Sequence, residues 1–324
     1  AVRIFRQNES GSLEEPEVYF LTGENPFNME IKDVTGDGLK DISYISTEGK
    51  QVLVVREQLA EGGFAAERSF ILDRSIRMYE TIRPKKGAEQ LVSVDSRSGA
   101  LEIFELQRSE LELDAHLLAT VQPASYPVFK QVKDGARYAF GDLNGDGSVD
   151  IQIANPADSE LIVFFGAEGS FTASKRFPTF SSISSLTAGR FFSNQDEALV
   201  CLSVEEKTLG LSRLEDGGRI SFPGLLEVGE GDPLVCEAVD LDGDGYDELA
   251  IVNEYDGKMQ LLLAQPTQRK KYGAPWEVTL QMDLVGVKRK PTAIRQLSAF
   301  GESGAGLILF IPREAPVLSL IHIS

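Results

Sequence analysis

Short runs of apolar residues bounded by turn residues recur along the chain. Residues 41–46, 150–155 and 248–253 are each six residues long and rich in β-branched or aromatic side chains. Runs of this length and composition predict strands. Residues 53–63 and 106–118 contain helix-favouring residues, but without sustained helical periodicity we interpret them as strands and connections. The pattern therefore predicts an all-β protein.

The strand pattern extends to a unit of four strands, which is clearest in the middle of the chain. The predicted strands are an inner strand at 138–140, a second at 151–153, a third at 161–165 and a fourth at 171–177. A turn at 156–159 joins the second and third strands as a hairpin. Four antiparallel strands per repeat are typical of a β-propeller blade, because radial stacking protects the strand edges.

Three acidic loops each precede one of the apolar runs: the first loop (33–41), the second loop (142–150) and the third loop (240–248). Each has oxygen-bearing side chains at loop positions 1, 3, 5 and 9, a spacing that lets a short turn surround one hard cation. Glycines at positions 4 and 6 permit the positive φ angles that fold such a loop back on itself. A solvated acidic turn could match once by chance, whereas three matches favour three calcium sites.

The predicted calcium ligands are the side chains at positions 1, 3, 5 and 9 and the main-chain carbonyl at position 7. They are Asp33, Thr35, Asp37, Leu39 and Asp41; Asp142, Asn144, Asp146, Ser148 and Asp150; and Asp240, Asp242, Asp244, Tyr246 and Glu248. Because the third loop offers four carboxylates, we expect affinity to decrease from the third site to the second and then the first. We expect all three ions to be structural, and Asp247 to be merely solvated.

An EF-hand is the main alternative for such loops. It needs flanking helices and a bidentate glutamate at loop position 12. Position 12 here holds Tyr44, Ile153 and Ile251, none of which offers a carboxylate. The strand-like segments after the loops also argue against flanking helices, so the EF-hand becomes a minor alternative.

The spacing of the loops reveals a repeat. The loops begin at Asp33, Asp142 and Asp240, which are 109 and 98 residues apart, or about two units of ~50 residues each. Copies of the strand pattern without the acidic set lie between and after them, at 88–104, 188–200 and 297–310. Although 324 residues would ordinarily suggest two domains, the repeat predicts one propeller domain over residues 1–317.

The repeat resembles those of FG-GAP or VCBS β-propellers, the fold of the integrin α-subunit head. The resemblance is closest in residues 140–147 (Phe-Gly-Asp-Leu-Asn-Gly-Asp-Gly) and 166–172 (Gly-Ala-Glu-Gly-Ser-Phe-Thr). It implies that each calcium loop joins the first and second strands of a blade. It also implies seven blades in the intact protein, with about six represented here.

The two ends of the chain look incomplete in this comparison. Residues 1–6 and 17–21 match the third and fourth strands of a blade whose first two strands are missing. Residues 318–324 resemble a translated sequencing adapter, and we give them no biological weight. There is neither an initiator methionine nor a signal peptide to interpret.

Composition limits the classes of partner. A hydrophobic fraction of 42% with 30 glycines and 14 prolines suits a turn-rich globular β protein. A net charge of −18 argues against nucleic acid, whose phosphates are bound by neutralisation with Lys and Arg. No apolar run is long enough to span a bilayer.

Other reactive residues are few. The basic clusters 269–271 and 288–290 are expected at opposite ends of one fourth strand, as solvated loops rather than one anion-binding patch. Cys201 and Cys236 are expected to be buried thiols rather than a disulfide. His116 is expected at the surface, and the single tryptophan, Trp276, gives little support to a sugar-stacking site.

Two classes of function remain. The first is a non-enzymatic, calcium-stabilised binding or scaffolding domain, as in cell adhesion, that engages a protein or glycan on the face away from the metals. Weak oxygen-ligand sites fill in millimolar calcium, so we expect an extracellular, periplasmic or cell-surface location. The alternative is a polysaccharide lyase or hydrolase. A channel-facing cluster of Lys, Arg and Tyr would favour the enzyme, and an aromatic loop surface would favour binding.

Overall fold

The fold is all-β throughout the residues that the structure describes. The computed structural model describes residues 2–4, 17–21, 27–35, 38–46, 52–71, 76–82, 89–95, 100–106, 119–120, 124–126, 128, 136–167, 170–192, 197–297, 306–311 and 317–320. All the regular secondary structure within these ranges consists of β-strands. The all-β prediction is therefore confirmed. Residues 107–118, which contain most of one helix-favouring segment and His116, lie outside the described residues.

The chain forms two compact units, Ala1–Val132 and Lys133–Ser324. The strands of the first unit are β1 (Val2–Ile4), β2 (Glu17–Tyr19), β3 (Phe27–Lys32), β4 (Asp41–Ser46), β5 (Val52–Arg56), β6 (Arg68–Ile71), β7 (Ile76–Ile82), β8 (Glu89–Asp95), β9 (Leu101–Leu106), β10 (Ala119–Thr120) and β11 (Ala124–Tyr126). Strands β3 to β6 pair in sequence order, and β10 joins β6 in parallel. Strands β7, β8, β9 and β11 form a four-stranded antiparallel sheet, and β1 pairs with β2.

The second unit repeats one sheet design. Its strands are β12 (Arg137–Gly141), β13 (Asp150–Ala154), β14 (Glu160–Phe164), β15 (Gly166–Ala167), β16 (Ser170–Phe171), β17 (Lys175–Pro178), β18 (Ser185–Gly189), β19 (Ala198–Ser203), β20 (Thr208–Ser212), β21 (Leu214–Glu215), β22 (Arg219–Ile220), β23 (Gly224–Leu225), β24 (Asp232–Val239), β25 (Glu248–Tyr255), β26 (Lys258–Pro266), β27 (Trp276–Asp283), β28 (Ala293–Leu297), β29 (Gly306–Phe310) and β30 (Val317–Leu320).

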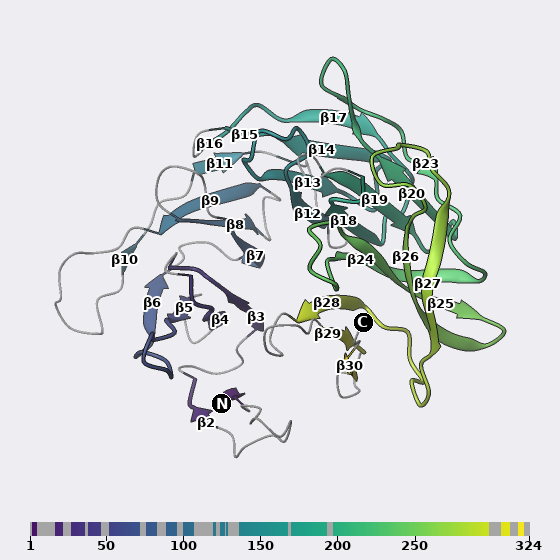
Figure 1. The fold of residues 1–324 in the computed structure, drawn as a ribbon. Coiled ribbons are helices and arrows are strands. Elements are labelled where there is room, and N and C mark those ends of the chain that lie inside the picture. The colour runs from purple at the N-terminus through teal and green to yellow at the C-terminus, as the bar shows by residue number, and fades with distance from the viewer. Residues whose placement is uncertain are drawn as a thin grey trace. The chain divides into compact units, whose positions relative to one another are not determined.

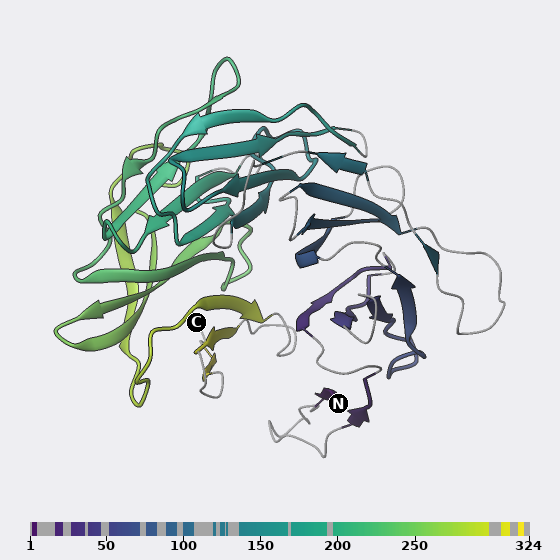
Figure 2. The same cartoon turned by 180° about the vertical axis from the view of Figure 1, so that it is seen from behind.

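Three four-stranded antiparallel sheets follow one another in this unit, with strand orders β12-β13-β14-β17, β18-β19-β20-β23 and β24-β25-β26-β27. A three-stranded sheet, β28-β29-β30, comes last. The first strands of these sheets contact one another in sequence order, β12 with β18, β18 with β24 and β24 with β28 (Figure 1). Figure 2 shows the same strands from behind. Each sheet thus forms one repeat, with its first strand next to the first strand of the following repeat.

The apolar core lies in layers between neighbouring sheets. On β19, Leu199 and Cys201 pack with residues of β12 to β14, whereas Val200 and Leu202 pack with residues of β25 and β26. Alternate residues of a strand point to opposite faces, so β19 is buried on both sides. Each fully buried leucine contributes roughly 1.5–3 kcal/mol relative to an exposed one. Burial on both faces explains why β19 has apolar residues at five successive positions, from Ala198 to Leu202.

Most predicted strands are present, with one clear error. Residues 41–46 form β4, and the runs after the second and third loops form β13 and β25. The predicted fourth strand is present as β17, which pairs with β14, but its predicted start at residue 171 is wrong, because Phe171 ends the short hairpin of β15 and β16 and β17 begins only at Lys175. Residues 317–320, most of which fall in the segment that resembles an adapter, form β30 and pair with β29.

Candidate metal centre

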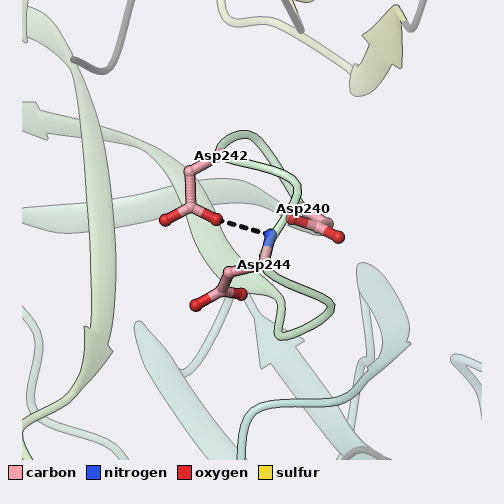
Figure 3. A group of neighbouring side chains, drawn as sticks. All are labelled: Asp240, Asp242 and Asp244. Atoms are coloured by element: carbon pink, nitrogen blue, oxygen red, sulfur yellow. Dashed lines mark hydrogen bonds between the residues drawn. The ribbon is translucent and has the colours of Figure 1, made fainter. Parts of the chain in front are cut away.

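The third loop connects β24 and β25 and brings three aspartates together. Asp240, Asp242 and Asp244 each offer a carboxylate oxygen, and these three oxygens lie within 4.8 Å of one another (Figure 3). Asp242 and Asp244 are exposed and Asp240 is partly exposed. Among the described acidic, histidine and cysteine side chains, this is the group with metal-binding spacing. The turn therefore brings together three of the predicted ligands of the third loop, and their binding of calcium stays a prediction.

Main-chain N–H groups hold these carboxylates in place. The N–H of Gly245 donates to Asp240 Oδ2 at 3.1 Å. The N–H of Asp244 donates to Asp242 Oδ1 at 3.0 Å, the bond drawn in Figure 3. Gly243 and Gly245 have φ angles of +76° and +86°, and nothing lies within 4 Å of a Cβ added to either. The backbone conformation, rather than a lack of space, thus requires glycine at both positions.

The second loop, between β12 and β13, follows the same plan. The N–H of Asp146 donates to Asp142 Oδ1 at 3.1 Å and to Asn144 Oδ1 at 3.0 Å, while the N–H of Ser148 donates to Asp146 Oδ1 at 2.7 Å. The last contact matches the 2.7 Å bond from Tyr246 to Asp244 in the third loop. Repetition of these bonds shows that the two sequences fold into the same local shape.

The first loop is described only in part. Asp37, a predicted ligand, and the preceding glycine lie outside the described residues. The N–H of Gly38 donates to Asp33 Oδ2 at 2.9 Å, which corresponds to the bond between Gly245 and Asp240. The described part of the loop therefore resembles the other two. The predicted main-chain ligands at position 7, Leu39 among them, stay a prediction.

Position 9 of each loop has a second role that its spacing does not reveal. We call Asp41, Asp150 and Glu248 the closing carboxylates; all three are buried. In each case one oxygen accepts the main-chain N–H of loop position 2, at 2.9, 2.9 and 3.1 Å respectively. The other oxygen is bonded to a segment beyond the third strand of the same sheet. Glu248 is not part of the three-carboxylate group of its loop.

The environment of the second and third loops raises the pKa of nearby carboxyls. Burial raises the pKa of Asp150 to about 7, and Asp142 and Asp146 act in the same direction, while hydrogen bonds from Gly166 and Leu143 oppose them. Burial likewise raises the pKa of Glu248. Both effects disfavour the charged carboxylates, whereas a nearby divalent cation would favour them.

Asp247 does more than face solvent, so its predicted role is corrected. Its Oδ2 accepts the N–H of Arg190 at 2.6 Å, and its own N–H donates to Arg190 O at 3.2 Å. Arg190 directly follows β18 in the preceding sheet. Sequence spacing could not show this contact, because it joins residues 57 positions apart.

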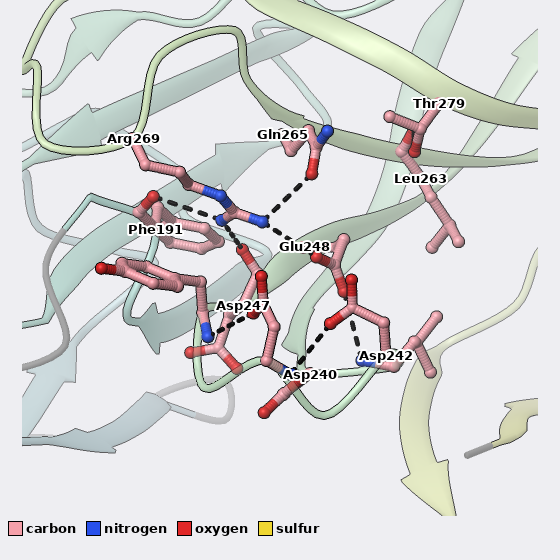
Figure 4. A network of polar contacts seen from close by, with 12 residues as sticks. Phe191, Asp240, Asp242, Asp247, Glu248, Leu263, Gln265, Arg269 and Thr279 are labelled. Carbon is pink, nitrogen blue, oxygen red and sulfur yellow. Dashed lines mark hydrogen bonds and ion pairs between the residues drawn. The ribbon is translucent and has the colours of Figure 1, made fainter. Parts of the chain in front are cut away.

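Arg269 was expected in a solvated basic loop, and that prediction is wrong. Its side chain is only 22% exposed and its guanidinium contacts Glu248, Gln265, Asp247 and Phe191 (Figure 4). Lys270 and Lys271, its neighbours, are exposed. The two basic clusters do flank the fourth strand β27, as predicted.

The remaining candidates are structural in character. Cys201 and Cys236 are buried free thiols, as predicted, and burial raises the pKa of each to about 12. Trp276 packs edge-on against Phe191 at 5.3 Å and Phe192 at 6.0 Å between ring centroids. The described residues include no helix with the length and apolar character needed to cross a membrane.

Comparison with known proteins identifies the architecture and no family. No protein-family model and no curated protein matches the chain. A structure described as a "putative 6-phosphogluconolactonase" from Bacteroides uniformis is similar at 13% identity and a TM-score of 0.60, covering 99% of this chain and 90% of that one. The structure of BBS1N in complex with ARL6DN is similar at 11% identity and a TM-score of 0.56, covering 99% of this chain and 89% of that one. The Dos1 propeller is similar at 9% identity and a TM-score of 0.50, covering 98% of this chain and 73% of that one. At these identities the likeness concerns fold alone, and the chain has the fold of a β-propeller.

Proposed function

We propose that this chain is a calcium-stabilised β-propeller of the FG-GAP or VCBS type, and that it binds a protein or a glycan at the cell surface, outside the cell or in the periplasm. The calcium ions stabilise the loops between first and second strands. Loops on the other face carry the binding surface. The observation that carries the proposal is the grouping of Asp240, Asp242 and Asp244 within 4.8 Å.

The chemistry of the donor set fits calcium. Calcium takes six to eight oxygen ligands and accepts carboxylates, amide oxygens and main-chain carbonyls. The third loop presents three carboxylates, and the second presents two with the amide of Asn144 between them. A further argument is Asp150, whose buried carboxyl carries a raised pKa that a bound cation would lower.

Protein binding is supported at the level of the fold. The similar BBS1N structure is of a complex with ARL6DN, so a propeller of this shape can serve as an interaction domain. Fold likeness does not transfer a partner, and the partner of this chain is proposed here only as a protein or glycan.

A carbohydrate-active enzyme is the second candidate, because two similar structures are each described as a "putative 6-phosphogluconolactonase". Two arginines on first strands of the second unit make contacts within the fold. Arg137 Nε donates to Ser184 O at 2.7 Å, and Arg295 pairs with Glu237 at 3.3 Å. Each contact joins one first strand to the next or to the residue just before it, so strand packing accounts for both, and they give no support to a polysaccharide lyase or hydrolase.

The double substitution Asp142→Asn and Asp146→Asn tests this proposal. Loss of two charges at the second loop should lower the melting temperature in millimolar calcium, because less binding energy then favours the folded state. With the metal chelated, the variant should melt close to the wild-type protein. Neither protein should cleave a panel of plant and bacterial polysaccharides, and cleavage by the wild-type protein would establish the enzyme instead.

A further inference from the structure

The closing carboxylate of the third loop is held by a different donor from those of the other two loops. In the first loop, the main-chain N–H of Gln58 donates to the closing carboxylate at 2.9 Å, and in the second, Gly166 does so at 2.8 Å. In the third loop, the corresponding contact to Glu248 comes from the side chain of Arg269, whose Nη2 lies 3.2 Å from Glu248 Oε1.

Strand register explains why a side chain is used. In each sheet, the residue after the closing carboxylate pairs with a residue of the third strand, and the expected main-chain donor lies two positions further on. In the first sheet Ile42 pairs with Arg56, and the donor is Gln58. In the second Ile151 pairs with Phe164, and the donor is Gly166. In the third Leu249 pairs with Ala264, which puts Pro266 at the position of the donor. Proline has no N–H, so the third sheet lacks the donor at the equivalent position.

We propose that Arg269 supplies the hydrogen bond that Pro266 cannot give, and that it is thereby the positioning residue of the third calcium loop. Pro266 is the last residue of β26, and Arg269 follows it by three positions in the connection to β27. This inference rests on the calcium site proposed above, and it adds a residue outside the loop to that site.

The contacts of Arg269 suit that role. Its Nη2 also donates to Gln265 Oε1 at 3.0 Å, and its Nη1 donates to the main-chain oxygen of Asp247 at 3.1 Å (Figure 4). The guanidinium carbon lies 5.0 Å from the ring centroid of Tyr246, at loop position 7. A planar guanidinium can make these contacts at once, which a lysine ammonium cannot. Arg269 therefore fixes the last three residues of the loop together.

The arrangement changes the charge count of the third site. One oxygen of Glu248 faces Arg269 and the other accepts the N–H of Leu241. Glu248 then shapes the loop, and the three aspartates face the metal. The affinity order predicted from four carboxylates counts a charge that Arg269 already neutralises.

Substitution of Arg269 and Pro266, singly and together, tests the proposal. Arg269→Gln should weaken calcium binding at the third site by about tenfold, the lower range for loss of a group that orients metal ligands. Pro266→Ala restores a main-chain N–H and should recover most of that affinity in the double variant. Titration calorimetry with calcium measures the affinities. Terbium luminescence excited through Tyr246 singles out the third site.

The melting temperature measured with calcium removed by a chelator gives an independent readout, because the effect of Pro266→Ala on it should reverse between the two backgrounds. Alone, Pro266→Ala should lower the melting temperature slightly, because it frees the unfolded chain. In the Arg269→Gln background the same change should raise it. Arg213→Gln, an exposed arginine 4.3 Å from the ring centroid of Tyr272, is the control and should bind calcium as the wild-type protein does.

The outcomes separate the two proposals. If the wild-type protein binds calcium but Arg269→Gln binds it equally well, or the double variant recovers no affinity, the role of Arg269 is overturned and the calcium proposal stands. A wild-type protein that binds no calcium, yet shows the melting recovery, would overturn the calcium function and keep the Arg269 contact. If Arg269→Gln does not fold, Arg269→Lys with and without Pro266→Ala makes the same comparison.

Discussion

The closing carboxylates show how single residues hold a loop to its sheet. Each of Asp41 and Asp150 accepts N–H groups from loop position 2 and from a residue 16 or 17 positions further along the chain. A short acidic turn is thereby fixed at two points. A metal bound as proposed would need only to join carboxylates that the backbone already orients.

Asp150→Ala tests this role at the residue scale. The substitution leaves the N–H groups of Leu143 and Gly166 without their carboxylate acceptor in a buried environment. Each such loss costs about 1–3 kcal/mol, so urea unfolding of the chelated protein should show a clear drop in stability. Asp150→Asn keeps one acceptor oxygen and should lose less. Equal stability of the two variants would refute the bonding role.

Sequence spacing could predict some site residues and not others. Asp240, Asp242 and Asp244 were predictable because a local turn brings them together. The contact between Asp247 and Arg190 and that between Glu248 and Arg269 depend on how strands and sheets pack, which spacing along one loop does not encode. Pro266 was the available signal for Arg269, but its meaning appears only once strand register is known.

At the scale of elements, local pattern predicted strands best where both faces are buried. Strand β4 matches its predicted range, residues 41–46, where Ile42, Tyr44 and Ile45 are buried among polar residues that are buried as well. Strand β17 was misplaced because its pairing with β14 sets its start at Lys175. Residues 170 and 171 instead pair back in a short hairpin.

The close approach of β18 to β24 gives a prediction at this scale. A Cβ added at Gly189 would lie 2.6 Å from Ala238 Cβ and 2.8 Å from Phe191 Cζ. Gly189→Ala should therefore force the two strands apart, at a cost of about 1–3 kcal/mol. Chemical denaturation measures this. Gly257→Ala is the comparison variant: nothing lies within 4 Å of its added Cβ, and its φ is +70°. Any loss of stability in that variant therefore comes from backbone strain and not from crowding. Unchanged stability of Gly189→Ala would contradict the packing of these strands.

At the scale of the whole molecule, the acidic loops belong to both compact units, the first to Ala1–Val132 and the other two to Lys133–Ser324. In the sequence, the connections that follow β7, β18 and β28 lack the acidic set, whereas those that follow β3, β12 and β24 carry it, so the two kinds alternate along the chain. One propeller domain of seven blades when intact stays a prediction from the repeat.

Calcium titration of the chelated protein tests the central claim most directly. Isothermal titration calorimetry should show about three calcium ions bound per chain, and calorimetric melting should occur at a higher temperature with calcium than with a chelator. Magnesium should bind more weakly, because it demands a near-ideal octahedral arrangement at short distances and gives up its waters reluctantly, whereas calcium accepts six to eight oxygen ligands. Absence of calcium binding together with an unchanged melting temperature on chelation would contradict the account.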